Sequence, residues 1–334
     1  MKAVTYLKEE TTTGEIKERK THKIKAILPL IGILINNIVY YFLPSYRSDL
    51  NTTNVYPILL WIIGLIYIGI LFISRNNKKS KENVIDKAPI LLAVTLLLIG
   101  LDILTLKTGF LPLPYFPWPD RILNAIINDR EVLAVSVLHS LRLLAVGYIS
   151  GAIVGLITGV LMGWYKWAYY WINPFMKAIG PIPAVTWIPL IMLLFPTGIY
   201  GSAFLIFLAV WFPVTLMTSS GISNVRNAYF EVAKTLGGNE KFLILKVAIP
   251  AALPNIFLGL FQGMTVSCVT LMVAEMLGVE AGLGWYISWA TGWAEYDKVY
   301  ASILIILITF SSIITLLFKI RSRALSWQKG VIKW

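Results

Sequence analysis

Residues 224–250 read NVRNAYFEVAKTLGGNEKFLILKVAIP, and this stretch decides the fold. It is a charged, helix-forming interlude of 27 residues between two long apolar runs, so we expect it to lie outside a bilayer that both neighbours cross. Residues 228–236 have helical periodicity, and Gly237 then predicts a left-handed stop. A second helical run extends from Glu240 to Pro250, which suits the first turn of a transmembrane helix. The stretch predicts a helix, a tight turn and a second helix on the aqueous side.

The composition is typical of a polytopic helical membrane protein. Hydrophobic residues make up 57% and charged residues 14%, and the mean hydropathy is +0.73, values that a soluble domain does not reach. The net charge of +12 does not indicate nucleic acid, because the basic residues stand at the ends of apolar runs. The first 24 residues are polar, so we expect no cleaved signal peptide. The single cysteine, Cys268, excludes an intrachain disulfide, and we expect no metal site.

Apolar runs long enough to cross a bilayer recur along the chain. A span needs about 20 residues at about 1.5 Å each. With residues 224–250 in the cytoplasm, 23 Lys and Arg residues fall on the cytoplasmic side and 5 outside, which predicts that both termini are cytoplasmic. The expected spans, of which prolines interrupt the fifth, are residues 25–43, 57–74, 88–106, 134–163, 174–195, 199–219, 253–277 and 300–318.

The polar loop after the second span predicts a domain boundary near residue 80. We expect residues 1–80 to form a cytoplasmic tail and two transmembrane helices. Residues 81–334 would form a six-helix domain that contains the 224–250 loop. No internal repeat is visible, which argues against the duplicated architecture of many secondary transporters.

The fourth span carries a glycine at every fourth position. Because four residues turn a helix about 40° past a full circle, these glycines form a slanting groove on one face. A neighbouring helix can press closely into such a groove with a right-handed crossing. The predicted packing residues are Gly147, Gly151, Gly155, Gly159 and Gly163.

Residues 174–196 contain too many prolines for a regular lipid-exposed helix. Each internal proline frees a carbonyl group, which hydrocarbon tolerates only where the backbone is buried in protein or lines a watery cavity. The segment is therefore a candidate wall of a translocation path, and a proline-kinked packing helix is the alternative. The path residues predicted here are Pro181, Pro183, Trp187 and Pro189.

Two acidic residues stand inside apolar runs. Glu275, followed by Met276, lies in the seventh span, and an ionisable residue there should face the bundle interior or a vestibule. We assign both residues to the translocation path, although Glu275 lies near the outer end, where the cost of a charge is lower. Asp102 in the third span is either interfacial or inward-facing.

The 224–250 loop resembles the cytoplasmic signature of the membrane subunits of binding-protein-dependent ABC importers. That signature is Glu-Ala-Ala, three residues, Gly, nine residues, Ile, one residue and Leu-Pro. An ordinary amphipathic linker is the alternative. The Pro-Ile-Pro-Ala element at residue 181 and the sequence VAEMLG around Glu275 resemble the nitrate, sulfonate and taurine branch of the family. The signature positions, with Val as the second residue and aliphatic changes at two others, are Glu231, Val232, Ala233, Gly237, Val247, Ile249 and Pro250.

The resemblance implies an all-α polytopic fold of the type I importer class. It has a MetI-like six-helix core, to which this chain adds about two N-terminal transmembrane helices. The loop would form the coupling helix that sits in a groove of a separate ABC ATPase subunit. Other implied partners are an extracytoplasmic substrate-binding protein and a second permease subunit, in a homodimer within a prokaryotic plasma (inner) membrane. The implied cargo is nitrate, a sulfonate, taurine or a similar small solute.

The sequence lacks the motifs of an enzyme. It has no phosphate loop of the form GxxxxGK[ST], so we expect no cofactor in this chain, with ATP and Mg bound by the partner ATPase. It shows no Ser/His/Asp order and no paired carboxylates, so we expect no catalytic residues. A secondary transporter or channel without an ATPase is the alternative, and it would predict more intramembrane charges and internal symmetry.

Overall fold

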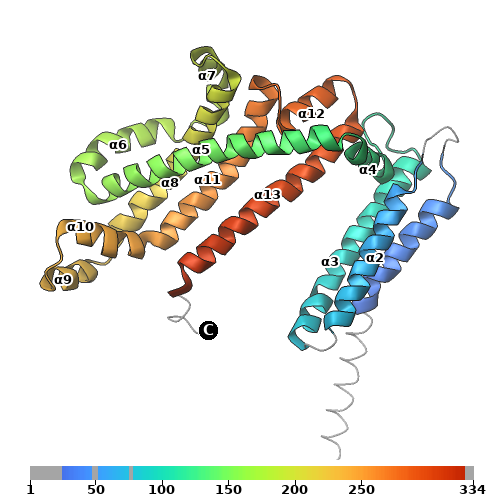
Figure 1. Cartoon of the computed structure of the whole chain (residues 1–334), viewed down its shortest axis with the longest axis horizontal. Coiled ribbons are helices and arrows are strands. Elements are labelled where there is room, and N and C mark those ends of the chain that lie inside the picture. Colours follow the sequence, from blue (N-terminus) through green and yellow to red (C-terminus); the bar gives the residue numbers. More distant parts are fainter. Residues whose placement is uncertain (1–24, 47–51, 75–77, 328–334) are drawn as a thin grey trace, which may run out of the picture. The chain divides into compact units, whose positions relative to one another are not determined.

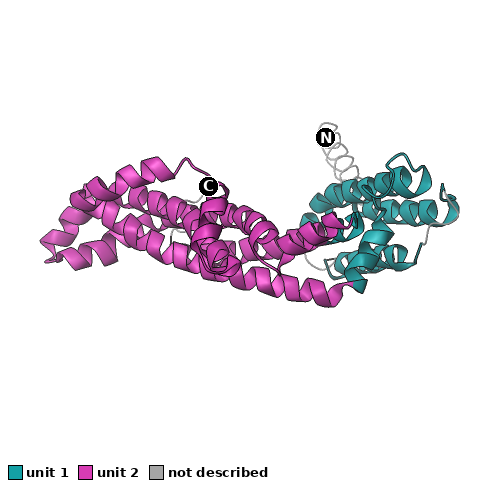
Figure 2. Ribbon diagram, turned by 90° about the horizontal axis from the view of Figure 1, so that it is seen from above, with its two compact units in different colours: residues 1–128, 294–301 teal, residues 129–293, 302–334 magenta. Residues whose placement is uncertain are grey.

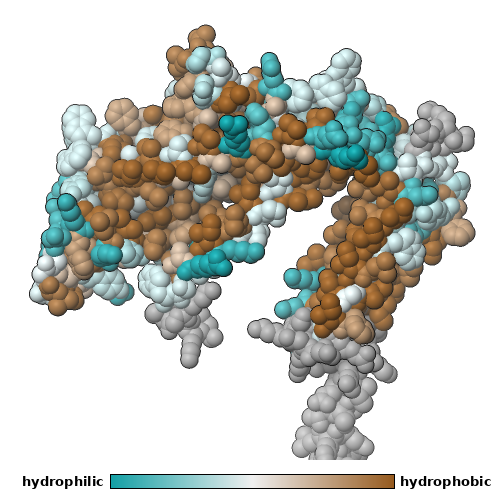
Figure 3. Space-filling view, in the orientation of Figure 1, coloured by the Kyte–Doolittle hydropathy of each residue, from teal (hydrophilic) through white to brown (hydrophobic). Residues whose placement is uncertain are grey.

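The computed structural model describes residues 25–46, 52–74 and 78–327, and these contain helices and loops but no strand (Figure 1). Apolar side chains cover the flanks of the helices, and hydrophilic ones gather towards their ends (Figure 3). In chain order the helices are Lys25–Phe42, α2 (Val55–Ser74), α3 (Lys78–Asp102), η1 (Ile103–Lys107), α4 (Pro119–Asn128), α5 (Arg130–Trp164), α6 (Lys166–Ile179), η2 (Ala184–Trp187), α7 (Ile188–Leu194), α8 (Gly198–Ser223), α9 (Asn227–Thr235), α10 (Glu240–Phe242), η3 (Leu243–Ala248), α11 (Ile249–Gly278), α12 (Leu283–Gly292) and α13 (Tyr296–Ala324).

Seven helices in the described ranges are long and apolar enough to cross a bilayer, and they match seven of the eight expected spans. The fifth expected span is a bent pair, in which Lys166–Ile179 and Ala184–Leu194 meet at 84°. The expected irregularity of residues 174–196 is therefore confirmed. The helical part begins earlier than the expected span, because the backbone is extended at Tyr165 and α6 starts at Lys166.

The chain divides into two compact units, which Figure 2 colours separately. The first comprises residues 1–128 and 294–301, and the second residues 129–293 and 302–334. This grouping follows contacts within the folded chain. The boundary expected at residue 80 from the sequence stays a prediction.

The first unit packs three membrane helices around a small apolar core. Tyr40, Tyr56 and Leu60 are among its buried residues. The buried side chains recur every three or four residues along these two helices, so they lie on the helix face that points into the core. The N-terminus of α2 is capped by a residue that is distant in the sequence. The carboxylate of Asp120 accepts hydrogen bonds from the backbone N–H groups of Thr53, at 2.7 Å, and Tyr56, at 3.0 Å.

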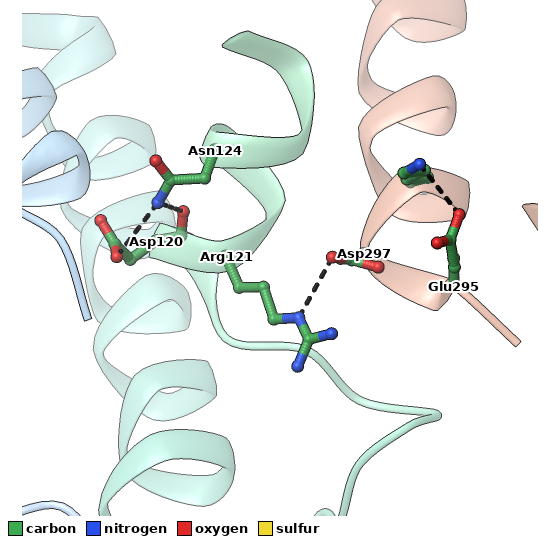
Figure 4. A network of polar contacts seen from close by, with 6 residues as sticks. Asp120, Arg121, Asn124, Glu295 and Asp297 are labelled. Carbon is green, nitrogen blue, oxygen red and sulfur yellow. Dashed lines mark hydrogen bonds and ion pairs between the residues drawn. The ribbon is translucent and has the colours of Figure 1, made fainter. Parts of the chain in front are cut away.

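A polar contact joins α4 to the first turn of α13, within the first unit (Figure 4). Arg121 Nε lies 3.1 Å from Asp297 Oδ2, and Lys298 Nζ lies 2.9 Å from Glu295 Oε2. Asn124 donates to the backbone oxygen of Asp120 one turn earlier. Since the Arg121 and Asp297 side chains are partly exposed, the ion pair fixes position more than it adds stability.

The second unit is built on α8, which lies between α5 and α11. A Cβ added at any of the five groove glycines of α5 would lie 2.6–2.9 Å from its nearest atom in α8. The side chains opposite them also recur at every fourth residue of α8. This row, which fills the groove, consists of Ile206, Val210, Val214, Thr218 and Ile222. On the other side of α8, Gly259 and Gly263 let α11 approach in the same way.

Candidate functional site

The loop between α8 and α11 has a sharply defined turn after α9. The N–H of Gly238 donates to the carbonyl of Ala233, and the N–H of Gly237 to that of Lys234, both at 2.9 Å. This hydrogen-bond pair is a Schellman motif, and it needs a left-handed residue in its second-to-last position. Gly237 has φ +82°, and no heavy atom lies within 4 Å of the place where its Cβ would be. The glycine is therefore required by the backbone, and the space beside it is open.

Helix α9 rests on the bundle by one face. Ala233 is buried, and the ring of Phe230 lies edge-on to Trp164 of α5, with centroids 5.4 Å apart. Trp164 Nε1 also donates to Glu240 Oε1 at 3.1 Å. These contacts hold α9 and the turn at the ends of α5 and α11.

A face formed by α9 and its C-cap residue, beside this packed face, is apolar and uncovered. Tyr229, Val232 and Leu236 are 53%, 60% and 83% exposed. Glu231 is exposed on the same short helix. An apolar surface at the end of a membrane bundle, rimmed by charged residues, is typical of a docking site for another protein.

The second half of the loop is continuous with the next span. Asn239 begins it by accepting a hydrogen bond from the N–H of Phe242 at 2.9 Å. A π-helical turn, η3, contains Val247. Helix α11 follows, with Ile249 and Pro250 in its first turn, where a backbone N–H group would have no acceptor within the helix and proline is therefore tolerated. The expected second helix is therefore present but does not end before the span.

A cavity of about 530 Å³ lies in the second unit where α6 and α7 bend. It contains no charged side chain among its lining residues, and its walls are mostly apolar. Polar groups come from Gln262 and Thr265 of α11. Of the predicted path residues, Pro183 and Trp187 line this cavity. Pro181 and Pro189 are exposed next to it in sequence and do not.

Glu275 lies elsewhere, in a fully buried cluster at the other end of α11. Its Oε2 accepts hydrogen bonds from Ser140 Oγ of α5 and from the N–H of Gly284 in α12, both at 2.9 Å. Ser140 Oγ in turn accepts from the N–H of Leu283 at 2.9 Å. The carboxylate thus accepts a hydrogen bond from a backbone N–H group in the first turn of α12 and, through Ser140, links α12 to α5. We call these residues the α12 clasp.

The residues of the α12 clasp are closely packed against Gly282. A Cβ at Gly282, which has φ +122°, would lie 2.4 Å from the carboxylate of Glu275. His139 Nδ1 lies 4.0 Å from Glu275 Oε1, beyond hydrogen-bond distance. Met276, the other residue assigned to the path with Glu275, is 42% exposed and does not line the cavity.

The structure thus separates residues that the sequence grouped as one path. It also adds residues that sequence reasoning missed, above all Gln262, Trp211 and Phe212 on the cavity wall. Gln262 is not ionisable, so it does not count among the intramembrane charges that the sequence singles out. A polar amide inside an apolar span could nevertheless have indicated an inward-facing residue. Nothing local in the sequence indicates that aromatic residues of α8 face a cavity.

Comparison with known proteins places this chain in a family. Residues 151–326 match the family model described as binding-protein-dependent transport system inner membrane component. An ABC transporter permease protein of Methanocaldococcus jannaschii is 28% identical over 192 residues, which cover 55% of this chain and 72% of that protein. SsuC of Bacillus subtilis, named as an aliphatic sulfonates transport permease, is 32% identical, with 56% and 67% covered. The nitrate import permease NrtB of Synechococcus elongatus is 29% identical, with 38% and 46% covered.

A solved structure has the same fold as the second unit's family region. A chain of the MetNI methionine ABC transporter, in an inward-facing form, aligns with a TM-score of 0.52 and 16% identity. The alignment covers 59% of this chain and 98% of that chain. An all-α, MetI-like core with additional N-terminal helices is therefore confirmed. The chain belongs to the binding-protein-dependent transport system inner membrane components, and it is a permease subunit of an ABC importer of the nitrate and sulfonate branch.

Proposed function

We propose that α9 and the turn at Gly237 are the coupling element on which a separate ABC ATPase subunit docks. The observation that carries this proposal is the uncovered apolar face of α9, formed by Tyr229, Val232 and Leu236. Glu231 and Val232 contribute exposed side chains. Ala233, Gly237, Val247, Ile249 and Pro250 set the shape of the element and its continuity with α11. ATP and Mg would be bound by the ATPase.

The remaining partners follow from the same assignment. The ATPase works from the cytoplasm, so α9 and both chain termini lie on that side. A second copy of this permease completes the path, and an extracytoplasmic protein delivers the cargo. The sequence supports this orientation through the excess of Lys and Arg on the α9 side.

Co-purification tests the proposal. The full chain is extracted from its native membrane in mild detergent, and its stoichiometric partners are identified by mass spectrometry. We expect an ATPase with a phosphate loop and a substrate-binding protein. Recovery of the chain alone, or with partners that hydrolyse no nucleotide, would favour a channel or secondary transporter.

Replacing Gly237 with valine is expected to abolish substrate-stimulated ATP hydrolysis by the reconstituted complex. A left-handed conformation costs about 1–2 kcal/mol in a residue with a Cβ, and more in a β-branched one, so the turn changes shape. The control is Gly237→Asn, because asparagine tolerates this conformation and open space surrounds the site. Equal stimulation in both variants would remove the coupling role.

We also propose that the cavity beside α7 is part of the translocation path. Its cargo is a small solute such as nitrate, a sulfonate, taurine or bicarbonate, the class carried by relatives such as NrtB, SsuC and CmpB. The cavity walls carry no carboxylate, so they do not repel an anion. The amide of Gln262 can donate a hydrogen bond to the anion, and this neutral contact is weak enough for the anion to be released.

Gln262→Leu is expected to lower cargo uptake by roughly fivefold, the effect of losing a hydrogen bond worth about 1 kcal/mol. Gln262→Glu should lower it further for an anion. The midpoint of thermal unfolding should not change, because Gln262 is exposed in the cavity. Uptake is measured in proteoliposomes, with Val269→Leu as a control outside the cavity. Undiminished uptake in both Gln262 variants would place the path elsewhere.

A further inference from the structure

The first unit contains a buried carboxyl group that accepts no hydrogen bond from any described residue. Asp102, the last residue of α3, has no exposed surface. Neither of its carboxylate oxygens has a hydrogen-bond partner. This resolves the alternative left by the sequence, since the residue is inward-facing rather than interfacial. An unpaired carboxylate in such a place is too costly to remain charged, and it is expected to bind a proton or a cation instead.

The neighbouring groups decide between these two ligands. Tyr40 of the first helix, Tyr56 of α2, Lys107 of η1 and Asp120 of α4 all lie within electrostatic range of Asp102. The nearest fixed cation, Lys107, is occupied, because its Nζ donates to the carbonyls of Tyr40 and Leu43 at 2.7 Å each. A second metal-sized cation beside this ammonium group would be repelled.

The cluster also contains a second buried acceptor without a donor. Asn36 is fully buried and donates from Nδ2 to the hydroxyl of Tyr56 at 2.7 Å, but its Oδ1 has no partner. Asp120 differs from Asp102, because its carboxylate accepts from two backbone N–H groups and the Thr53 hydroxyl. A proton on Asp102 would remove its charge and add a donor to a region that has an unpaired acceptor.

The backbone is also unusual at this point. The helix changes from α-helical to π-helical at Ile103, directly after Asp102. π-Helical turns are uncommon and are found frequently at functional sites. From these observations we propose that Asp102 is a proton-binding site, neutral in the resting protein, within the first unit of this permease.

Infrared spectroscopy of the full chain in lipid nanodiscs tests the proposal. At neutral pH the wild type is expected to show the C=O stretching band of a protonated carboxylic acid, and Asp102→Asn should lower its intensity by one carboxyl group. Glu275→Gln measures separately what another fully buried carboxyl group contributes to the band. Asp120→Asn is the matched control, because both oxygens of that carboxylate already accept hydrogen bonds and its replacement should leave the band in place.

Three results would overturn the proposal. One is the absence of a carboxylic acid band from the wild type, which means that Asp102 is ionised. The second is a band of unchanged intensity in Asp102→Asn, which assigns the proton to another residue. The third is a band that disappears when sodium is added, which identifies a cation site. If Asp102→Asn does not fold, Asp102→Glu replaces it, because a band that belongs to this residue then shifts in frequency.

Discussion

Replacing Gly159 of α5 with leucine is expected to prevent the permease from folding, and Gly159→Ala to lower its stability. An added Cβ would lie 2.6 Å from Thr218 Cβ and 2.8 Å from the carbonyl oxygen of Thr215. The backbone oxygen cannot move aside without separating the two helices. Overpacking by a single methyl group commonly costs about 1–3 kcal/mol, and leucine adds three more carbons. The measurement is the midpoint of thermal unfolding in detergent, together with the monodisperse fraction.

Two other glycines give matched controls for this substitution. Gly69 of α2 and Gly100 of α3 are also inside membrane helices, but no heavy atom lies within 4 Å of either Cβ position. Alanine at these positions should be neutral or should stabilise the chain by roughly 0.5–1 kcal/mol, because it removes the entropy cost of a helical glycine. If Gly159→Ala unfolds at the same temperature as Gly100→Ala, the close contact between α5 and α8 is not present.

Glu275→Ala is expected to release α12 from the rest of its unit. The substitution leaves Ser140 and the N–H of Gly284 buried without their acceptor. Because hydrogen bonds to a charged group contribute about 1.5–3 kcal/mol each, the loss should be about 3–5 kcal/mol. Cleavage by a glutamyl endopeptidase at exposed Glu280, in the linker before α12, reports this release, and its rate should rise more than a hundredfold.

The control for this prediction is Glu275→Gln, which keeps an oxygen acceptor of the same length. It should retain most of the protection of Glu280, because one amide oxygen can still accept from Gly284. An independent variant, Gly282→Ala, should expose the same linker, since its Cβ would meet the carboxylate of Glu275. If Glu275→Ala is protected as well as the wild type, the α12 clasp does not hold the helix.

Features with a local physical cause were predictable from the sequence. Seven spans follow from hydropathy, because the bilayer demands about 20 apolar residues regardless of neighbours. The turn after α9 follows from Gly237, since only the left-handed conformation closes the helix there. Prolines also indicated that residues 174–196 would not form one straight helix.

Features that depend on distant parts of the chain were not predictable. Glu275 and Ser140 are 135 residues apart, so no spacing rule joins them, and the sequence placed Glu275 on the path. Asp120 caps α2 from 64 residues away for the same reason. The first eight residues of the helix Lys166–Ile179 lay outside the expected span, which began at Pro174, the first of its prolines.

The continuous helix from Glu240 to Gly278 joins the two ends of the second unit in one rod. Its 39 residues span roughly 58 Å at the rise of an α-helix. The rod begins beside the Gly237 turn and ends at the α12 clasp. If the ATPase docks at α9 as proposed, the rod would act as a lever, and a tilt applied at this end would displace α12 at the other. The π-helical turn η3, near the loop end, is where such a lever would bend first, so the stiffness of η3 would set how much of the tilt reaches α12.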